Sequence, residues 1–173
     1  MSKKTKKLTT ISLMLALCIL GGNIKLLGSI ALDSFPAFLS AIILGPIPGA
    51  FIAFFGHMIS AMLSGFPNTL PIHLVIAFLM MICVFVYGTI RVKWSNRPVV
   101  SKVVSIIVAF LISVPLDLVI LYPILGEVVF ILAVPLTIAT FMNLFLTDIV
   151  YAVLPSKVKH YLHVPSSYSG GSK

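Results

Sequence analysis

The stretch Leu44-Gly45-Pro46-Ile47-Pro48-Gly49-Ala50 divides two apolar runs of the sequence, residues 30–45 and 48–64. Its two prolines cannot continue a helix, because proline has no backbone N–H and its ring clashes with the preceding turn. Each run is short for a full membrane crossing, which takes roughly 20 residues. The stretch therefore predicts a tight hairpin of two helices within a membrane.

Further apolar runs flank this hairpin at residues 8–24, 72–90, 99–122 and 127–154. Of the 173 residues, 60% are hydrophobic and only 9% are charged, whereas a soluble domain has about 45–50% apolar and about 25% charged residues. The sequence predicts an all-α, polytopic protein of the cell membrane. We expect a single six-transmembrane-helix domain over residues 1–160 and a flexible polar tail over residues 161–173.

The net charge of +8 would suggest nucleic-acid binding in a soluble protein, but here the basic residues lie between apolar runs, where they indicate topology. With six spans and a cytoplasmic N-terminus, every lysine and arginine except Lys25 falls on the cytoplasmic side. An odd number of spans would separate the lysine-rich N-terminus from Lys157 and Lys159. We therefore expect both termini in the cytoplasm and no nucleic-acid partner.

Motifs of enzymes and cofactor sites are missing from the sequence. It contains no HExxH, GxSxG, GxxxxGK[ST] or GxGxxG pattern, which leaves metalloprotease, serine hydrolase and nucleotide-binding activities unsupported. Cys18 and Cys83 lie inside apolar runs, without the spacing of a disulfide framework or a zinc site. We expect no catalytic residue, no metal and no cofactor.

Polar residues at membrane depth are costly and are candidates for function. Asp33, Asp117 and Glu127 are predicted near the outer ends of their spans. Either they face water and headgroups, or they line a pocket that opens outward. His57 is predicted close to mid-membrane in the third run, where it is either a ligand contact or a satisfied core residue.

Two polar residues of the last run have different predicted positions. Asn143 is expected near the middle of the membrane, where it either hydrogen-bonds across helices or contacts a solute. Asp148 is expected on the inner side, as a structural partner of Lys157 and Lys159.

The central part of the chain contains several short motifs that belong together: Ile30-Ala31-Leu32-Asp33-Ser34-Phe35-Pro36, the 44–50 stretch, Gly56-His57, Gly65-Phe66-Pro67 and Leu70-Pro71-Ile72-His73. This segment resembles the substrate-binding S component of energy-coupling factor (ECF) vitamin transporters. Within that family it is most similar to the alpha-ribazole transporter subgroup. The resemblance implies a six-helix membrane protein that binds one small solute near its outer face.

The same resemblance implies partners. S components dock on a membrane T subunit that carries two cytoplasmic ATPase subunits, which would explain why this chain has no ATPase motif. The docking surface in the family is an Ala-x-x-x-Ala pattern on the first helix. Here the matching residues are Ser12 and Ala16, which we expect to contact the T subunit.

Alpha-ribazole has a dimethylated aromatic base and ribose hydroxyls, so its pocket needs apolar walls and a few polar groups. The residues expected in these roles are Phe35 and Phe66 at the base, His57 at a base nitrogen, and Asp33, Asn68 and His73 at the ribose. Three alternatives remain at this stage: another vitamin such as pantothenate, a membrane enzyme of lipid metabolism, or a structural subunit without a ligand.

Overall fold

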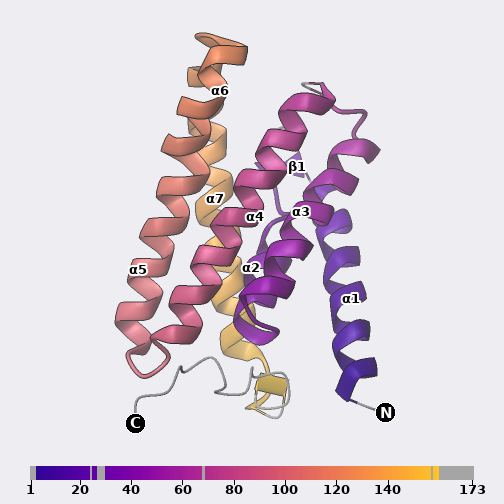
Figure 1. Ribbon diagram of the computed structural model, residues 1–173, viewed down its shortest axis with the longest axis vertical. Coiled ribbons are helices and arrows are strands. Elements are labelled where there is room, and N and C mark those ends of the chain that lie inside the picture. The colour runs from indigo at the N-terminus through magenta and orange to yellow at the C-terminus, as the bar shows by residue number, and fades with distance from the viewer. Residues whose placement is uncertain (1–2, 24, 27–29, 68, 157, 160–173) are drawn as a thin grey trace.

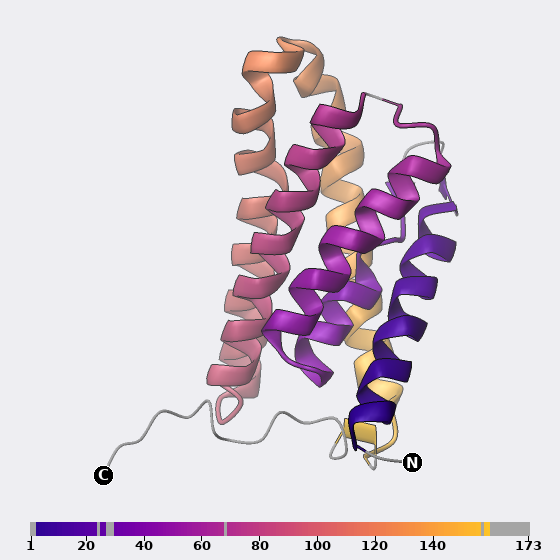
Figure 2. The same ribbon diagram turned by 45° about the vertical axis from the view of Figure 1, so that its right-hand side comes forward.

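The computed structural model describes residues 3–23, 25–26, 30–67, 69–156 and 158–159, and these form a bundle of antiparallel helices (Figures 1 and 2). Asn68, Lys157 and the predicted tail 161–173 lie outside the described residues. In chain order the elements are α1 (Lys3–Asn23), β1 (Lys25–Leu26), β2 (Ile30–Ala31), α2 (Phe35–Ile43), α3 (Pro46–Leu63), α4 (Leu70–Lys93), α5 (Pro98–Leu111), the π-helical turn η1 (Ile112–Leu116), α6 (Asp117–Leu125) and α7 (Val128–Val153).

The helices confirm an all-helical, multi-pass membrane protein. Within the described residues, five helical segments are long and apolar enough to cross a membrane. They are Lys4–Gly22, Pro46–Leu63, Leu70–Lys93, Pro98–Leu125 and Val128–Val153. The fourth of these joins α5, η1 and α6 into one continuous rod, which is visible on the left of Figure 1.

The second apolar run differs from the prediction, because its helix begins only at Phe35 rather than at residue 30. Residues 30–31 instead form β2, which pairs antiparallel with β1. The amide of Leu32 then donates a hydrogen bond to the carbonyl of Gly21 at the end of α1. With nine residues, α2 is roughly 14 Å long, less than half of the ~30 Å hydrocarbon core of a bilayer.

The predicted hairpin between the second and third runs is confirmed, with one change in detail. Gly45 makes the turn with a φ of 104°, a conformation that glycine adopts without steric cost. Pro46 and Pro48 lie inside the first turn of α3 rather than in the loop. Proline is tolerated there because the first amides of a helix have no partner within the helix.

Helix α2 packs closely between α3 and α4. A Cβ atom added to Gly49 of α3 would lie 2.6 Å from the Cα of Ala41, and one added to Gly88 of α4 would lie 2.7 Å from the Cβ of Ala41. Beside this contact, the rings of Phe38 and Tyr87 pack edge to face with centroids 4.9 Å apart. The glycines therefore allow the short helix to lie in the centre of the bundle.

The small residues of α3 and α1 have different surroundings. A Cβ atom added to Gly56 would lie 2.7 Å from the Cβ of Cys18 on α1, so this part of α3 packs inside the bundle. Ser12 and Ala16, one turn apart on α1, are both exposed. These two residues therefore belong to the outer surface of the bundle.

A polar cluster lies at the end of the bundle that contains the α4–α5 connection and the start of α1 (Figure 1). The carboxylate of Asp148 lies 3.2 Å from Arg91 Nη2 and 3.1 Å from Lys102 Nζ. Asp148 is therefore a structural partner of cations on α4 and α5, and the predicted partner Lys159 instead donates a hydrogen bond to the carbonyl of Ala152. The reason is that α4 and α5 bring their own cations next to α7 at this level.

Candidate ligand-binding site

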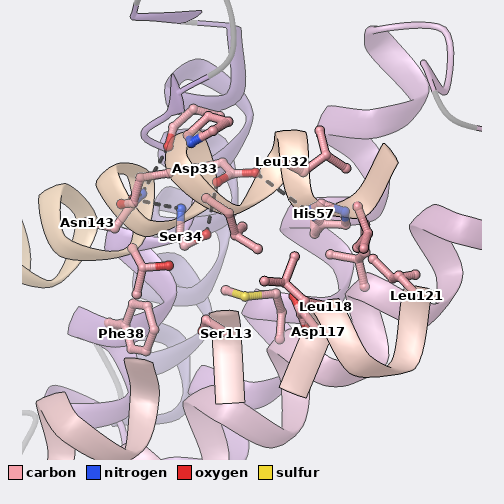
Figure 3. Close-up of a pocket in the computed structure, with 18 residues that line it drawn as sticks. Asp33, Ser34, Phe38, His57, Ser113, Asp117, Leu118, Leu121, Leu132 and Asn143 are labelled. Atoms are coloured by element: carbon pink, nitrogen blue, oxygen red, sulfur yellow. Dashed lines mark hydrogen bonds and ion pairs between the residues drawn. The ribbon is translucent and has the colours of Figure 1, made fainter. Parts of the chain in front are cut away.

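A pocket of about 260 Å³ lies among β2, the start of α2, α3, α4, η1, α6 and α7 (Figure 3). Most of its wall is apolar, with side chains such as Phe38, Met80 and Leu121. Its polar lining residues are Asp33, Ser34, His57, Ser113, Asp117, Thr140 and Asn143. An apolar wall with a few polar groups is typical of small-molecule sites.

Asn143 on α7 holds the start of α2 in place. Its Oδ1 atom accepts hydrogen bonds from the amides of Ser34 at 3.1 Å and Phe35 at 2.8 Å. Its Nδ2 atom donates to the carbonyls of Ala31 at 2.9 Å and Ala139 at 2.8 Å. An asparagine side chain can accept two bonds and donate two, so its capacity is used. Of the two predicted roles, the bond between segments is therefore the one observed.

Three neighbouring polar side chains lie in a row that leads away from the pocket: Asp33, His57 and His73. Ser34 donates a hydrogen bond to Asp33 Oδ1 at 2.9 Å, and Asp33 Oδ2 lies 3.6 Å from His57 Nδ1. The other ring nitrogen of His57 lies 3.3 Å from Nδ1 of His73. His57 thus faces the pocket and is held by polar groups on two sides. Its Nδ1 and Nε2 atoms are oriented by Asp33 and His73.

Asp117 begins α6 directly after the π-helical turn η1. Pro115 inside this turn has no backbone N–H, and a π-turn accommodates such an interruption within a helix. The Asp117 side chain lines the pocket but is only 2% exposed. Its Oδ1 atom has no hydrogen-bond partner among the described residues. Of the two predicted options, Asp117 therefore lines the pocket and does not face water at a helix end.

The structure brings together only part of the predicted binding set. Asp33 and His57 line the pocket. His73 lies behind His57, and the ring of Phe66 lies 5.9 Å from that of His73. Phe35 contributes its amide to Asn143, and its side chain is not part of the lining.

Asp117 and Asn143 were each predicted with a pocket or solute contact as one of two options, whereas Ser113 and Thr140 of the lining were not predicted from the sequence. The spacing of these residues carries a signal: Ser113 and Asp117 are four residues apart, and Thr140 and Asn143 are three apart, so each pair shares a helix face. The hydroxyl of Ser113 already lies 3.2 Å from Cys83 Sγ. Among the described residues, no three His, Cys, Asp or Glu side chains are grouped as metal ligands.

Comparison with known families gives one match over nearly the whole chain. Residues 2–160 match the model of the family described as ECF-type riboflavin transporter, S component. No curated protein and no solved structure matched the chain. The chain therefore belongs to the ECF S-component family that this model describes, and it is a multi-pass membrane subunit that binds the substrate of a vitamin-type transporter.

Proposed function

We propose that this S component captures alpha-ribazole for uptake into the cell. The observation that carries the proposal is the pocket itself: it is small, mostly apolar, and contains the acids Asp33 and Asp117 beside one histidine. In the part of the chain that the structure describes, no lysine or arginine lines it. Such a pocket suits an uncharged aromatic base with sugar hydroxyls better than a vitamin with a carboxylate.

In this proposal, Asp33 and His57 contact the ligand. A carboxylate accepts hydrogen bonds from hydroxyl groups, and His57 is oriented by its two neighbours. His73 supports His57 on the side away from the pocket, and the ring of Phe66 packs near that of His73. Phe35, whose side chain is not part of the lining, and Asn68, which lies outside the described residues, stay predictions.

Riboflavin is the second candidate, because the matching family is named for riboflavin transporters. Like alpha-ribazole, it joins a dimethylated aromatic system to a chain of hydroxyls and carries no charge. Its tricyclic ring is larger, whereas the pocket of about 260 Å³ lies just below the usual range of about 300–1,000 Å³. Pantothenate and biotin carry a carboxylate and fit the two acids poorly.

The deciding experiment is isothermal titration calorimetry on the detergent-purified protein with alpha-ribazole, riboflavin, pantothenate and biotin. We expect tight binding of alpha-ribazole. Tight binding of riboflavin instead would mean that riboflavin is the substrate, and the family assignment would stand. Binding of pantothenate or biotin alone would contradict the argument from the pocket's charge.

We further propose six crossings with both termini in the cytoplasm. The second crossing would consist of the non-helical segment 30–34, whose first two residues form β2, followed by α2, whose half-buried start is held by Asn143. Non-helical backbone is tolerated at membrane depth where protein covers it. Cysteines introduced at Asn96 and Lys157 should then be labelled from the cytoplasm, and one at Asn68 from outside.

The proposed partners are the T subunit and its two ATPases, with Ser12 and Ala16 at the contact. Both residues are exposed on α1, and small residues allow close helix packing in membranes. Replacing either by Trp should abolish uptake in the full transporter. The ligand affinity of the isolated subunit should stay the same, because α1 contributes no residue to the pocket lining.

A further inference from the structure

The carboxyl group of Asp117 is the buried polar group of the pocket that the fold leaves without a described partner. Asn143, in the same pocket, uses all of its hydrogen-bonding capacity. Asp33 is held by Ser34 and His57. By contrast, Asp117 is 2% exposed and its Oδ1 atom has no hydrogen-bond partner in the described part of the chain.

Such a group costs stability, because removing a polar atom from water without a replacement hydrogen bond is unfavourable. The cost is offset when another molecule supplies the missing bond. The group lines a cavity that is large enough for a small molecule. It also comes from α6, a different wall from the one that holds Asp33 (Figure 3).

We propose that Asp117 is a second ligand-binding residue, which accepts a hydrogen bond from a hydroxyl or N–H group of the substrate. This contact favours substrates that carry hydrogen-bond donors. This inference rests on the proposed function, since it assigns a further contact within the same pocket. It also predicts a charge restriction: phosphorylated forms are disfavoured, because no described lysine or arginine lines the pocket to pair with their anion.

The test compares stability with binding in one variant. Asp117→Val removes the unpartnered carboxyl, so the empty protein should unfold at a higher temperature than the wild type. The same variant should bind alpha-ribazole at least about tenfold more weakly, because the substrate's donor loses its acceptor. A residue that only supports the fold would change both quantities in the same direction.

Two further variants complete the experiment. Asp117→Asn keeps the shape and one acceptor oxygen, so it should lose less affinity than Asp117→Val. Glu127→Gln is the matched control, because it makes the same acid-to-amide change at an exposed residue outside the pocket lining. It should change neither the unfolding temperature nor the affinity.

Charge selection is tested on the wild type with alpha-ribazole and its phosphorylated form, and with the same pair for riboflavin. The phosphorylated forms should bind at least about 100-fold more weakly than the free forms. Comparable binding of the two forms overturns the charge restriction. Unchanged affinity in Asp117→Val, or a joint loss of affinity and stability, overturns the assignment of Asp117. If neither free compound binds the wild type, the proposed function fails and the inference falls with it.

Discussion

Two carboxylates in this bundle have opposite surroundings. Asp148, at the end with the α4–α5 connection, lies 3.2 Å from Arg91 and 3.1 Å from Lys102. Asp117, in the pocket, has an oxygen atom without a described partner. Burying a carboxyl group in a membrane bundle costs free energy, and the two residues use it differently. The carboxylate of Asp148, which has partners, stabilises the contact between helices, whereas the carboxyl group of Asp117, which has an unpartnered oxygen, is available to a ligand.

Removal of the paired carboxylate should have the largest effect on stability. Asp148→Ala leaves Arg91 with a side chain only 10% exposed and no acidic partner in the described cluster. Breaking such a pair by removing one member costs about 3 kcal/mol or more. The free energy of unfolding, measured in detergent, should fall by about this amount. The affinity of the folded fraction for the ligand should not change, and a parallel loss of affinity would contradict the separation of the two regions.

Asn143 lies in the same pocket as Asp117, but all of its hydrogen-bonding groups have partners. Asn143→Ala would leave the amides of Ser34 and Phe35 and the carbonyl of Ala31 without their partner. We expect a loss of about 2–3 kcal/mol in the free energy of unfolding. Binding should weaken too, because Asp33 and Ser34 line the pocket from the segment that Asn143 holds. Thr140→Val, one turn away in the lining, is the control; an equal loss there would argue against a special role of Asn143.

A substitution of Asp33 tests whether the pocket binds the ligand. Asp33→Ala removes the carboxylate beside His57, and a hydrogen bond to a charged group is worth about 1.5–3 kcal/mol. Affinity for the ligand should therefore fall roughly 10- to 150-fold in calorimetry. Glu127→Ala, at an exposed acid, should bind as the wild type does. Wild-type affinity of Asp33→Ala would remove Asp33 from the proposed site.

The sequence predicted much of the helical framework, because hydropathy and charge report directly on membrane crossings. Runs at 72–90 and 127–154 correspond to α4 and α7 within a few residues. The start of α2 was predicted wrongly, since hydropathy counts side chains and is the same for an extended and a helical backbone. Residues 30–31 are held as a strand by the pairing with β1, and the side-chain amide of Asn143, more than 100 residues away in the chain, fixes the non-helical segment that follows through Ala31, Ser34 and Phe35.

The site was predicted only in part, because the sequence reports the depth of a residue in the membrane but not how the helices pack around it. Asp33 and His57 were selected from their depth along the sequence, and they lie in the pocket together. Depth alone gave Asp117 an outer position that was compatible with water, whereas its burial depends on how α4 and α7 pack around it. Arg91 and Lys102 were missed as partners of Asp148 because they come from α4 and α5, far from Asp148 in the sequence.

Lys102 should show the smallest effect, and it separates the two cations around Asp148. Its side chain is 50% exposed, whereas that of Arg91 is 10% exposed. Water and salt screen an exposed pair, so Lys102→Ala should lower the free energy of unfolding by less than about 1 kcal/mol. The difference in the free energy of unfolding between Lys102→Ala and the wild type should become still smaller at high ionic strength. A loss as large as that of Asp148→Ala would mean that the exposed lysine, and not the buried arginine, stabilises the paired carboxylate.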